Sequence, residues 1–327
     1  MKMPSAEVPT IDVSPLFGAD ADAKKQVAEQ INKACRGSGF FYASGHGVDV
    51  QRLQDVVNEF HRTMTAAEKH ELAINAYNPA NPRVRNGYYK AIEGKKAVES
   101  FCYLNPDFDE DHPMIRAGVP GHEVNTWPDA ERHPGFREFC EEYFRTMFTL
   151  SKVLMRGFAL ALGKDELFFE PELRESETLS AVSLIRYPHL ETYPPVKTGP
   201  DGELLSFEDH FDVSMITVLY QTQVQNLQVE TVDGWRDLPT DSDNFLVNAG
   251  TYLAHLTHDY FPAPLHRVKF VNAERLSLPF FFHAGNDTLI QPFSPDGAHE
   301  GEPNEAIRYG DYLRHGLTAL IKKNGQT

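Results

Sequence analysis

The stretch that decides the fold is Ser206-Phe207-Glu208-Asp209-His210-Phe211-Asp212-Val213-Ser214, with Met215-Ile216-Thr217-Val218-Leu219-Tyr220 directly behind it. The second run is apolar and β-branched, which favours a strand. Side chains two positions apart on a strand point to the same face. The imidazole of His210 and the carboxylate of Asp212 are therefore predicted to converge, while Phe211 points away from them and packs in the sheet.

A His and an Asp on one face need a second His from elsewhere to form a three-ligand metal site with open positions opposite. That ligand set is typical of non-haem Fe(II) oxygenases. The H-x-D pair alone is weak evidence, because 14 histidines and 47 acidic residues make chance pairs common. A hydrogen-bonded His beside a solvated Asp is the plainer interpretation of the pair. Residues further along the chain decide between the two.

Length and composition limit the class of protein. With 327 residues, 41% of them hydrophobic, the chain can bury a large core. No run approaches the ~18 apolar residues of a membrane span, and the N-terminus lacks the apolar core of a signal peptide. Three scattered cysteines exclude a disulfide framework or a zinc knuckle. A cytoplasmic location follows.

The formal net charge of −16 limits the partners. Nucleic acid and anionic membranes bind basic patches, so neither is expected to bind this chain. An anionic small molecule would need arginines placed locally at its site. We expect a monomer that acts on a small molecule.

The period of the hydrophobic pattern changes along the chain. Helices are predicted at residues 20–35, 50–64, 133–163 and 309–323, and the aromatic stripe of the third is expected to pack in the scaffold. A capping box at Thr65-x-x-Glu68 predicts a further short helix. Short strands are predicted at 9–14, 39–43 and 99–104.

From about residue 178 onwards the period is two, and turn signals come closer together. Strands are predicted at 179–187, 214–220, 227–231, 245–248, 252–256, 264–271 and 276–282, with a hairpin at Asp233-Gly234. The order favours a double-stranded β-helix (jelly roll) wrapped by N-terminal and C-terminal helices. Within a single domain, 1–327, we expect mainly helical wrapping with some strands at 1–177, the metal-carrying core at 178–290, and a C-terminal helix and tail at 305–327.

Three later histidines are candidates for the third metal ligand. His255 and His258 lie close together, and His266 opens an alternating run. The same face of that run carries Val268 and Phe270, which are apolar neighbours suited to a metal pocket.

Arg275-Leu276-Ser277 follows nine residues after His266. Residues at i and i+2 of a strand share a face, so a guanidinium and a hydroxyl here can clasp one carboxylate. A metal triad followed by a carboxylate clasp describes an oxygenase that binds an acid beside its iron.

The motifs H-x-D, His266-Arg267-Val268 and Arg275-x-Ser277 resemble those of the iron- and 2-oxoglutarate-dependent oxygenase superfamily. Longer runs resemble one family within it, the isopenicillin N synthases, over nearly the whole chain. These runs are residues 11–18 (IDVSPLFG), 94–106 (GKKAVESFCYLNP), 224–231 (VQNLQVET) and 324–327 (NGQT). They are far more specific than the metal motif.

The resemblance implies a reaction. The family closes both rings of isopenicillin N from the tripeptide δ-(L-α-aminoadipoyl)-L-cysteinyl-D-valine, with Fe(II) and one O2, and releases two waters. It uses no 2-oxoglutarate, and ascorbate can serve as a reductant in vitro. His210, Asp212 and His266 would be the iron ligands at the catalytic centre. Gln326 would be a further ligand in the resting state, which the substrate displaces.

The resemblance also implies substrate contacts. Arg275 and Ser277, with Tyr187, would hold the valine carboxylate, and Arg85 would face the aminoadipoyl end. The residue pattern itself adds Tyr89, whose phenol near Arg85 could hydrogen-bond a carboxylate. The side chains expected to wall the pocket and keep water from the oxidant are apolar: Phe207, Leu219, Leu227, Val268, Pro279 and Phe281.

One position departs from the family pattern. Ala181 stands where the family has a serine that helps to bind the aminoadipoyl end. Ser183 lies two residues further on the same predicted strand and shares its face. We expect Ser183 to take over that contact.

Two other functions fit the motif spacing. In a 2-oxoglutarate-dependent hydroxylase or desaturase, Arg275 and Ser277 would grip the carboxylate of the cosubstrate. A metal-binding jelly roll without catalysis, such as a storage or regulatory protein, would keep the triad alone.

Overall fold

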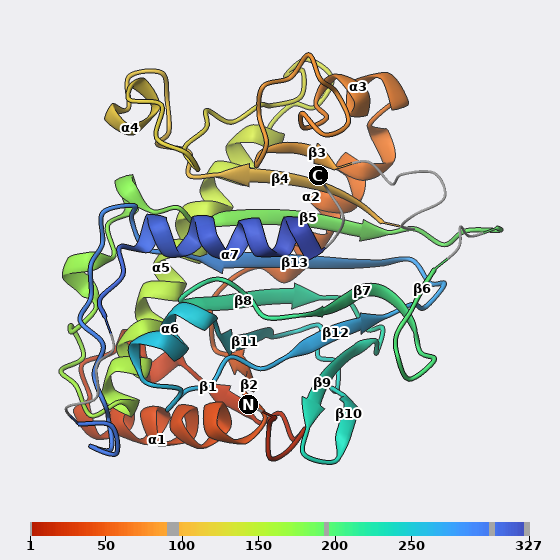
Figure 1. Cartoon of the computed structure of the whole chain (residues 1–327). Coiled ribbons are helices and arrows are strands. Elements are labelled where there is room, and N and C mark those ends of the chain that lie inside the picture. Colours follow the sequence, from red (N-terminus) through yellow and green to blue (C-terminus); the bar gives the residue numbers. More distant parts are fainter. Residues whose placement is uncertain (1, 90–97, 193–195, 301–304, 324–327) are drawn as a thin grey trace.

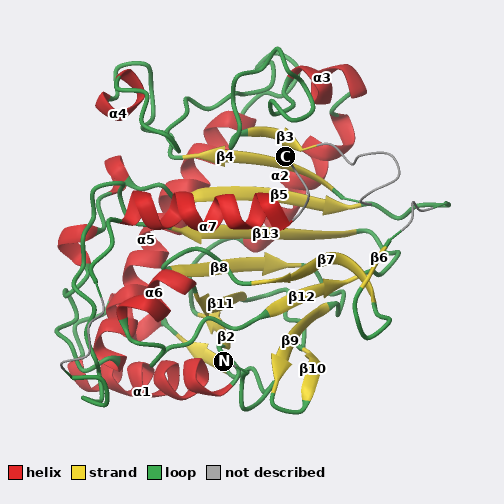
Figure 2. Cartoon of the chain, viewed as in Figure 1, coloured by secondary structure: helices red, strands yellow, loops and turns green. Residues whose placement is uncertain are grey.

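The computed structural model describes residues 2–89, 98–192, 196–300 and 305–323, which are built around two β-sheets (Figures 1 and 2). The larger sheet has eight strands in the order β1-β2-β11-β8-β13-β5-β4-β3, and the smaller has five in the order β10-β9-β12-β7-β6. Strands β1 and β2 are parallel, whereas the other neighbours pair antiparallel. The two sheets form the predicted double-stranded β-helix.

The strands are short, as the turn spacing predicts. They are β1 (Thr10–Asp12), β2 (Phe40–Ser44), β3 (Gly87–Tyr89), β4 (Glu99–Leu104), β5 (Ala181–Tyr187), β6 (Lys197–Thr198), β7 (Leu204–His210), β8 (Ile216–Gln221), β9 (Leu227–Thr231), β10 (Gly234–Asp237), β11 (Phe245–Ala249), β12 (His266–Lys269) and β13 (Arg275–Phe282). The predicted hairpin at Asp233-Gly234 is confirmed, because β9 and β10 pair across it and Gly234 has a φ of 93°.

Several helices begin at side chains that accept hydrogen bonds from their first N–H groups. Asp20 accepts hydrogen bonds from the N–H groups of Asp22 and Ala23 at the start of α1, and Thr65 and Glu68 form the predicted capping box of α3. The helices are α1 (Ala21–Gly37), α2 (Val50–Thr63), α3 (Ala66–Glu71), α4 (Pro113–Arg116), α5 (Phe136–Ala161), α6 (Thr251–Leu256) and α7 (Tyr309–Lys323), with 3-10 turns η1 (Ser14–Phe17), η2 (Glu170–Glu172) and η3 (Glu175–Glu177).

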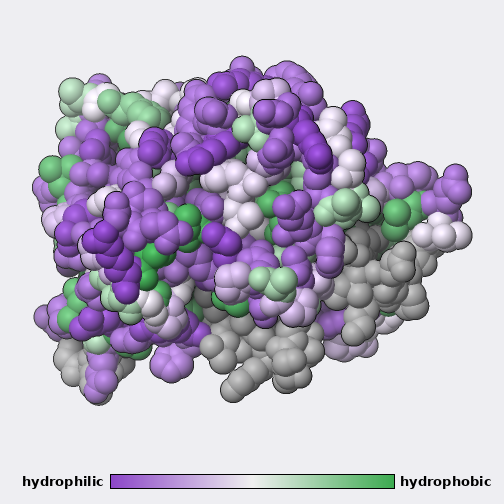
Figure 3. Space-filling view, turned by 90° about the horizontal axis from the view of Figure 1, so that it is seen from above, coloured by the Kyte–Doolittle hydropathy of each residue, from purple (hydrophilic) through white to green (hydrophobic). Residues whose placement is uncertain are grey.

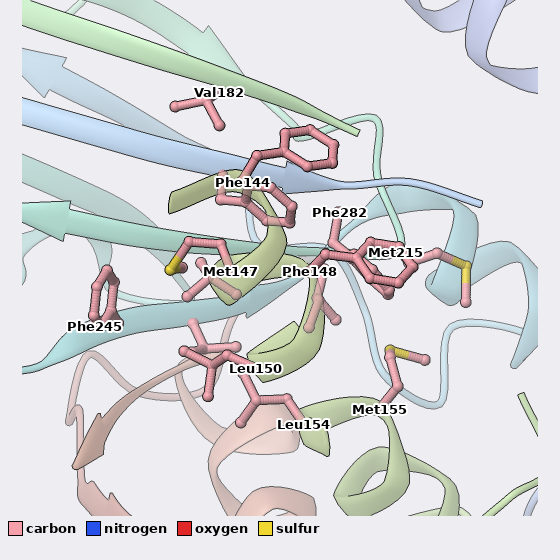
Figure 4. Close-up of a cluster of buried hydrophobic side chains, with 14 of the residues drawn as sticks. Phe144, Met147, Phe148, Leu150, Leu154, Met155, Val182, Met215, Phe245 and Phe282 are labelled. Carbon is pink, nitrogen blue, oxygen red and sulfur yellow. The ribbon is translucent and has the colours of Figure 1, made fainter. Parts of the chain in front are cut away.

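Helix α5 covers one face of the larger sheet, as Figure 4 shows. The rings of Phe144 and Phe280 lie 5.4 Å apart, and so do those of Phe148 and Phe282. These aromatic side chains are fully or almost fully buried, and each such burial contributes about 1.5–3 kcal/mol. The aromatic stripe is therefore scaffold packing, as predicted. The smaller sheet and α7 lie on the opposite face of the larger sheet (Figure 1).

One predicted strand is wrong, since residues 252–256 lie in helix α6. The alternating pattern of these residues resembles a strand, but contacts of Gly250 and Thr251, just before them, determine the backbone conformation. A Cβ on Gly250 would lie 2.1 Å from the carbonyl oxygen of Ser214, so only glycine permits this approach. The N–H of Thr251 then donates to the carbonyl oxygen of Asp212 at 2.8 Å.

The face of the molecule in Figure 3 is largely hydrophilic, with hydrophobic residues in scattered groups. This agrees with a formal net charge of −16. None of the helices in the described ranges is both long enough and apolar enough to cross a membrane.

Candidate metal centre and substrate site

Three side chains on the smaller sheet and the loop after it converge. His210, Asp212 and His266 each offer a ligand atom, and these atoms lie within 4.8 Å of one another. Asp212 Oδ1 is 3.8 Å from His210 Nε2 and 3.7 Å from His266 Nε2. His266 stands opposite His210 in the pairing of β12 with β7. The choice of His266 as the third member is confirmed.

The convergence arises differently from the prediction. Strand β7 ends at His210, so Asp212 lies in the loop before β8 rather than on the strand. The hydrogen bond from Thr251 to the backbone of Asp212 holds that loop. The predicted packing of Phe211 in the sheet is wrong: this side chain is 37% exposed. The alternation of β7 does not continue into the loop that carries Phe211 and Asp212.

Both imidazoles are held by backbone carbonyls. His210 Nδ1 lies 2.8 Å from the carbonyl oxygen of Glu208, and His266 Nδ1 lies 3.0 Å from that of Pro264. A carbonyl oxygen only accepts, so Nδ1 carries the proton in both neutral rings. The lone pair of each Nε2 is left facing Asp212, which is the orientation that metal-binding histidines need.

Asp212 is buried, with 7% exposure, and Asn248 Nδ2 donates to its Oδ2 at 3.0 Å. Burial alone raises the pKa of this carboxyl, but His266, His210 and the amide of Asn248 more than offset it. The pKa therefore lies below its ordinary value. Asn248 was missed by the sequence analysis, because its role depends on β11 being the neighbour of β8.

The donor set fits a divalent iron ion. Two imidazole nitrogens and one carboxylate converge, which is the set that non-haem Fe(II) sites use. Apolar and aromatic side chains surround it, including the Phe207 ring, 4.5 Å from that of His210. The ring of Phe40 meets that of His266 edge-on at 5.9 Å.

The two other candidate histidines lie outside this group. His255 belongs to α6, and its Nε2 lies 3.2 Å from the carbonyl oxygen of Glu305. His258 stacks on His299 with ring centroids 5.3 Å apart.

The predicted clasp lies on β13. Arg275 stands opposite Tyr187 of β5, and its guanidinium carbon is 3.2 Å from the centre of the Tyr187 ring. Arg275 is only 5% exposed, and its Nε and Nη2 have no hydrogen-bond partner within the described ranges. Burial lowers its pKa, although an arginine remains charged in any protein environment. A buried cation with free donors is a receptor for a carboxylate.

Arg85 lies just before β3, and its guanidinium reaches the residues that precede β5. Its Nη1 donates to the carbonyl oxygen of Gly121 at 2.8 Å and its Nη2 to that of Leu179 at 3.4 Å. Burial lowers its pKa, and Glu123 partly opposes that effect. The hydroxyl of Tyr89 donates to backbone carbonyl groups of the 84–85 segment. Arg85 is thus fixed by the chain itself.

Ser183 shares the outward face of β5 with Ala181, and both are half-buried. The Ser183 hydroxyl lies 3.0 Å from the sulfur of Cys102 on β4. Burial raises the pKa of the Cys102 thiol, so it stays protonated at neutral pH. The predicted ligand contact of Ser183 stays a prediction, and its hydroxyl already has one neighbour.

The side chains predicted to wall the pocket come from both sheets. On the larger sheet Leu219 stands opposite Pro279, and Phe281 stands opposite Ala181. On the smaller sheet Leu227 and Val268 are register partners. Gln326, the remaining predicted site residue, lies outside the described residues.

Known proteins resemble this chain at the level of domain models and of fold. Residues 179–284 match the model of the 2OG-Fe(II) oxygenase superfamily, and residues 8–130 match that of the non-haem dioxygenase in morphine synthesis N-terminal region. A Neurospora crassa protein solved with alpha-KG and thymine has a TM-score of 0.77 at 23% identity, covering 96% of this chain and 97% of that one. A rice dioxygenase for auxin oxidation has a TM-score of 0.67 at 21% identity, covering 96% of each chain. These structures share the fold.

Much closer relatives span the whole chain. The isopenicillin N synthase of Amycolatopsis lactamdurans is 80% identical over 328 residues and covers 100% of both chains. That of Penicillium rubens is 55% identical over 327 residues and covers 99% of each. The chain belongs to the isopenicillin N synthase family of the 2OG-Fe(II) oxygenase superfamily.

Proposed function

We propose that this chain converts δ-(L-α-aminoadipoyl)-L-cysteinyl-D-valine into isopenicillin N, closing first the β-lactam and then the thiazolidine ring. The substrate loses four hydrogens, and one O2 is reduced to two waters, so no 2-oxoglutarate is needed. The observation that carries the proposal is the 80% identity to an isopenicillin N synthase over the whole chain. The converging triad supports it independently.

His210, Asp212 and His266 would hold Fe(II), which when bound supplies a site for the substrate thiolate and for the reduction of O2. The Nδ1–H groups of His210 and His266 would donate to backbone carbonyls, which leaves the Nε2 lone pair of each ring for the metal. Asn248 keeps the Asp212 carboxylate in one orientation. We propose Gln326 as the ligand of the resting site.

The free Nε and Nη2 of Arg275, with the Ser277 hydroxyl on the same face, would hold the valine carboxylate. The Tyr187 ring beneath the guanidinium fixes its plane. Hydrogen bonds between charged groups typically contribute about 1.5–3 kcal/mol each. This contact sets the position of the valine side chain that must close on sulfur.

Arg85, Tyr89 and Ser183 would bind the aminoadipoyl end, with Arg85 supplying the charge. The walls from both sheets would keep water from the reacting carbons and hold each C–H group in one place. Misplacement of either C–H group would allow hydroxylation in place of ring closure.

We also propose a monomer that works in the cytoplasm. The net charge of −16 opposes self-association. Cys35, Cys102 and Cys140 form no disulfide, which suits a reducing compartment. Light scattering on the purified protein, expected to give 36.9 kDa, checks the first point.

The test is to incubate the tripeptide with the protein, Fe(II) and ascorbate in air and to measure the molecular mass of the product by mass spectrometry. We expect a mass lower than that of the tripeptide by four hydrogens, and none of it without Fe(II). A product that gains an oxygen atom would assign the chain to the hydroxylases instead. Iron binding without any product would favour a metal-binding protein.

A further inference from the structure

His283 follows β13 and continues the face that carries Arg275, Ser277 and Phe281. The side chain is 4% exposed and lies next to Tyr309, the first residue of α7. Helix α7 runs across this side of the larger sheet, in front of β13 (Figure 1). The predicted strand ended at residue 282, so the sequence analysis missed this residue, although the period of two extends to it.

The imidazole of His283 is fixed in place and in tautomer. Its Nδ1 is hydrogen-bonded to the Tyr309 hydroxyl, and its backbone N–H donates to Ser180 Oγ at 2.9 Å. Within the described part of the chain the buried phenol has no other acceptor, so donation to Nδ1 satisfies it. The ring proton is then on Nε2.

The Nε2–H group of His283 has no hydrogen-bond partner in the part of the chain that the structure describes. Burial, followed by the charge of Arg85, lowers the pKa of His283 to about 3, so the ring is neutral. Asp212 acts on the same pKa in the opposite direction. The backbone joins the two side chains: Arg85 Nη2 donates to the carbonyl oxygen of Leu179, and the N–H of Leu179 donates to that of Ala284, the residue after His283. The unpaired donor therefore lies on the Arg85 side of the site, where the aminoadipoyl end would bind.

The distal carboxylate of the tripeptide requires more hydrogen-bond donors than Arg85 supplies, and the Nε2–H group of His283 is one such donor. A carboxylate accepts about four hydrogen bonds, whereas Arg85 already gives Nη1 and Nη2 to two carbonyl groups. Ala181 offers no hydroxyl, and the Ser183 hydroxyl has Cys102 as a neighbour. A neutral N–H adds a hydrogen bond without placing a second positive charge beside the guanidinium.

We propose that His283, positioned by Tyr309, is a specificity-determining residue whose Nε2–H donates to the distal carboxylate of the tripeptide beside Arg85. The proposal rests on the proposed function. It assigns to His283 a contact that in this chain neither position 181 nor Arg85 alone provides.

The test compares three peptides on one variant. His283→Phe keeps a ring of similar size and removes the N–H. Dissociation constants come from anaerobic titration of each peptide into the Fe(II) protein, followed by the thiolate-to-iron charge-transfer absorption. We expect about tenfold weaker binding of the aminoadipoyl peptide and of its adipoyl analogue, which keeps the distal carboxylate. Binding of the 5-aminopentanoyl analogue, which lacks that carboxylate, should not change.

Two further variants separate this contact from a packing effect. His283→Gln, which offers an amide N–H, should recover part of the loss. Tyr309→Phe, which only frees the tautomer, should show the same peptide pattern with a smaller loss. His255→Phe on α6 is the control and should bind all three peptides as the unaltered protein does.

An equal loss for all three peptides in His283→Phe, or no loss for any, would overturn the proposal. Failure of the proposed function would differ, because the unaltered protein would then give no absorption band with any peptide. Fe(II) affinity of the peptide-free variants, measured by calorimetry, should equal that of the unaltered protein.

Discussion

Buried Arg275 and partly buried Arg85 would mark the two ends of the proposed substrate site, and their hydrogen bonding differs. Arg275 has two nitrogens, Nε and Nη2, without hydrogen-bond partners in the described structure. Arg85 already donates to the carbonyl oxygens of Gly121 and Leu179. Removal from water lowers the pKa of both guanidinium groups, so the charged form of each carries a desolvation cost.

This difference indicates how each end binds. A buried cation with free donors is costly until an anion arrives, so a carboxylate at Arg275 gains strength from relieving that cost. Arg85 gains less relief, because its Nη1 and Nη2 already donate to carbonyl oxygens without ligand. It can offer charge, and other groups must supply part of the hydrogen bonding. The end at Arg275 should dominate affinity, and the end at Arg85 should tune specificity.

The largest effect is expected at the metal triad. His210→Ala, Asp212→Ala or His266→Ala removes one of only three ligand groups and should reduce turnover to background and Fe(II) binding with it. Calorimetry with Fe(II) and product detection measure the two losses. His255→Ala and His258→Ala should retain both, and loss of iron in His258→Ala alone would contradict the assignment of His266.

The next effect tests the state of Arg275. Arg275→Leu should weaken tripeptide binding by roughly 100-fold, since a desolvated charge pair contributes about 2–5 kcal/mol. The peptide-free variant should be no less stable, and up to about 1 kcal/mol more stable, because an unpaired buried charge is gone. Anaerobic titration and denaturant unfolding provide the two numbers. A large drop in the stability of the peptide-free variant would show that Arg275 is satisfied in the resting protein.

Arg85→Gln should have a smaller effect. The distal carboxylate loses a charge but keeps other donors, so binding should weaken about tenfold with little change in kcat. Steady-state kinetics at saturating O2 separate KM from kcat. If Arg85→Gln proved as damaging as Arg275→Leu, the contrast between the two ends would not hold.

The smallest effect on function is expected at a buried polar group behind the site. His61 lies beside Tyr88 and Glu99, and burial lowers its pKa to about 4. The unfolded chain, with an ordinary pKa of about 6.5, therefore binds the proton first. The free energy of unfolding should fall as the pH drops from about 6.5 to about 4, by on the order of 3 kcal/mol from this group.

Urea unfolding across that pH range measures the slope. His61→Gln should make it shallower and leave tripeptide binding at neutral pH unchanged. An unchanged slope would mean that other groups, such as His283, account for all of the acid sensitivity.

Much of the site could be predicted because its residues repeat with the period of a strand. Arg275 and Ser277 share a face of β13, and His266 opens β12, as the alternation indicated. Asp212 converges with His210 although the strand ends between them, because α6 holds its loop.

What the sequence could not indicate depends on contacts between distant segments. Helix α6 alternates like a strand but is set by the approach of Gly250 to Ser214. Asn248 reaches Asp212 only because β11 pairs with β8. Whether each arginine has hydrogen-bond partners depends on backbone carbonyl groups from distant segments, which no local sequence pattern identifies.

The central claim is that the open face of the triad serves the thiol of the substrate and O2, with Arg275 holding the substrate's own carboxylate. Measuring O2 consumed, succinate released and isopenicillin N formed in one reaction, with and without 2-oxoglutarate, tests it most directly. The account predicts one O2 per product, no succinate, and a rate independent of 2-oxoglutarate. Succinate in proportion to product, or no O2 uptake until 2-oxoglutarate is added, would contradict it.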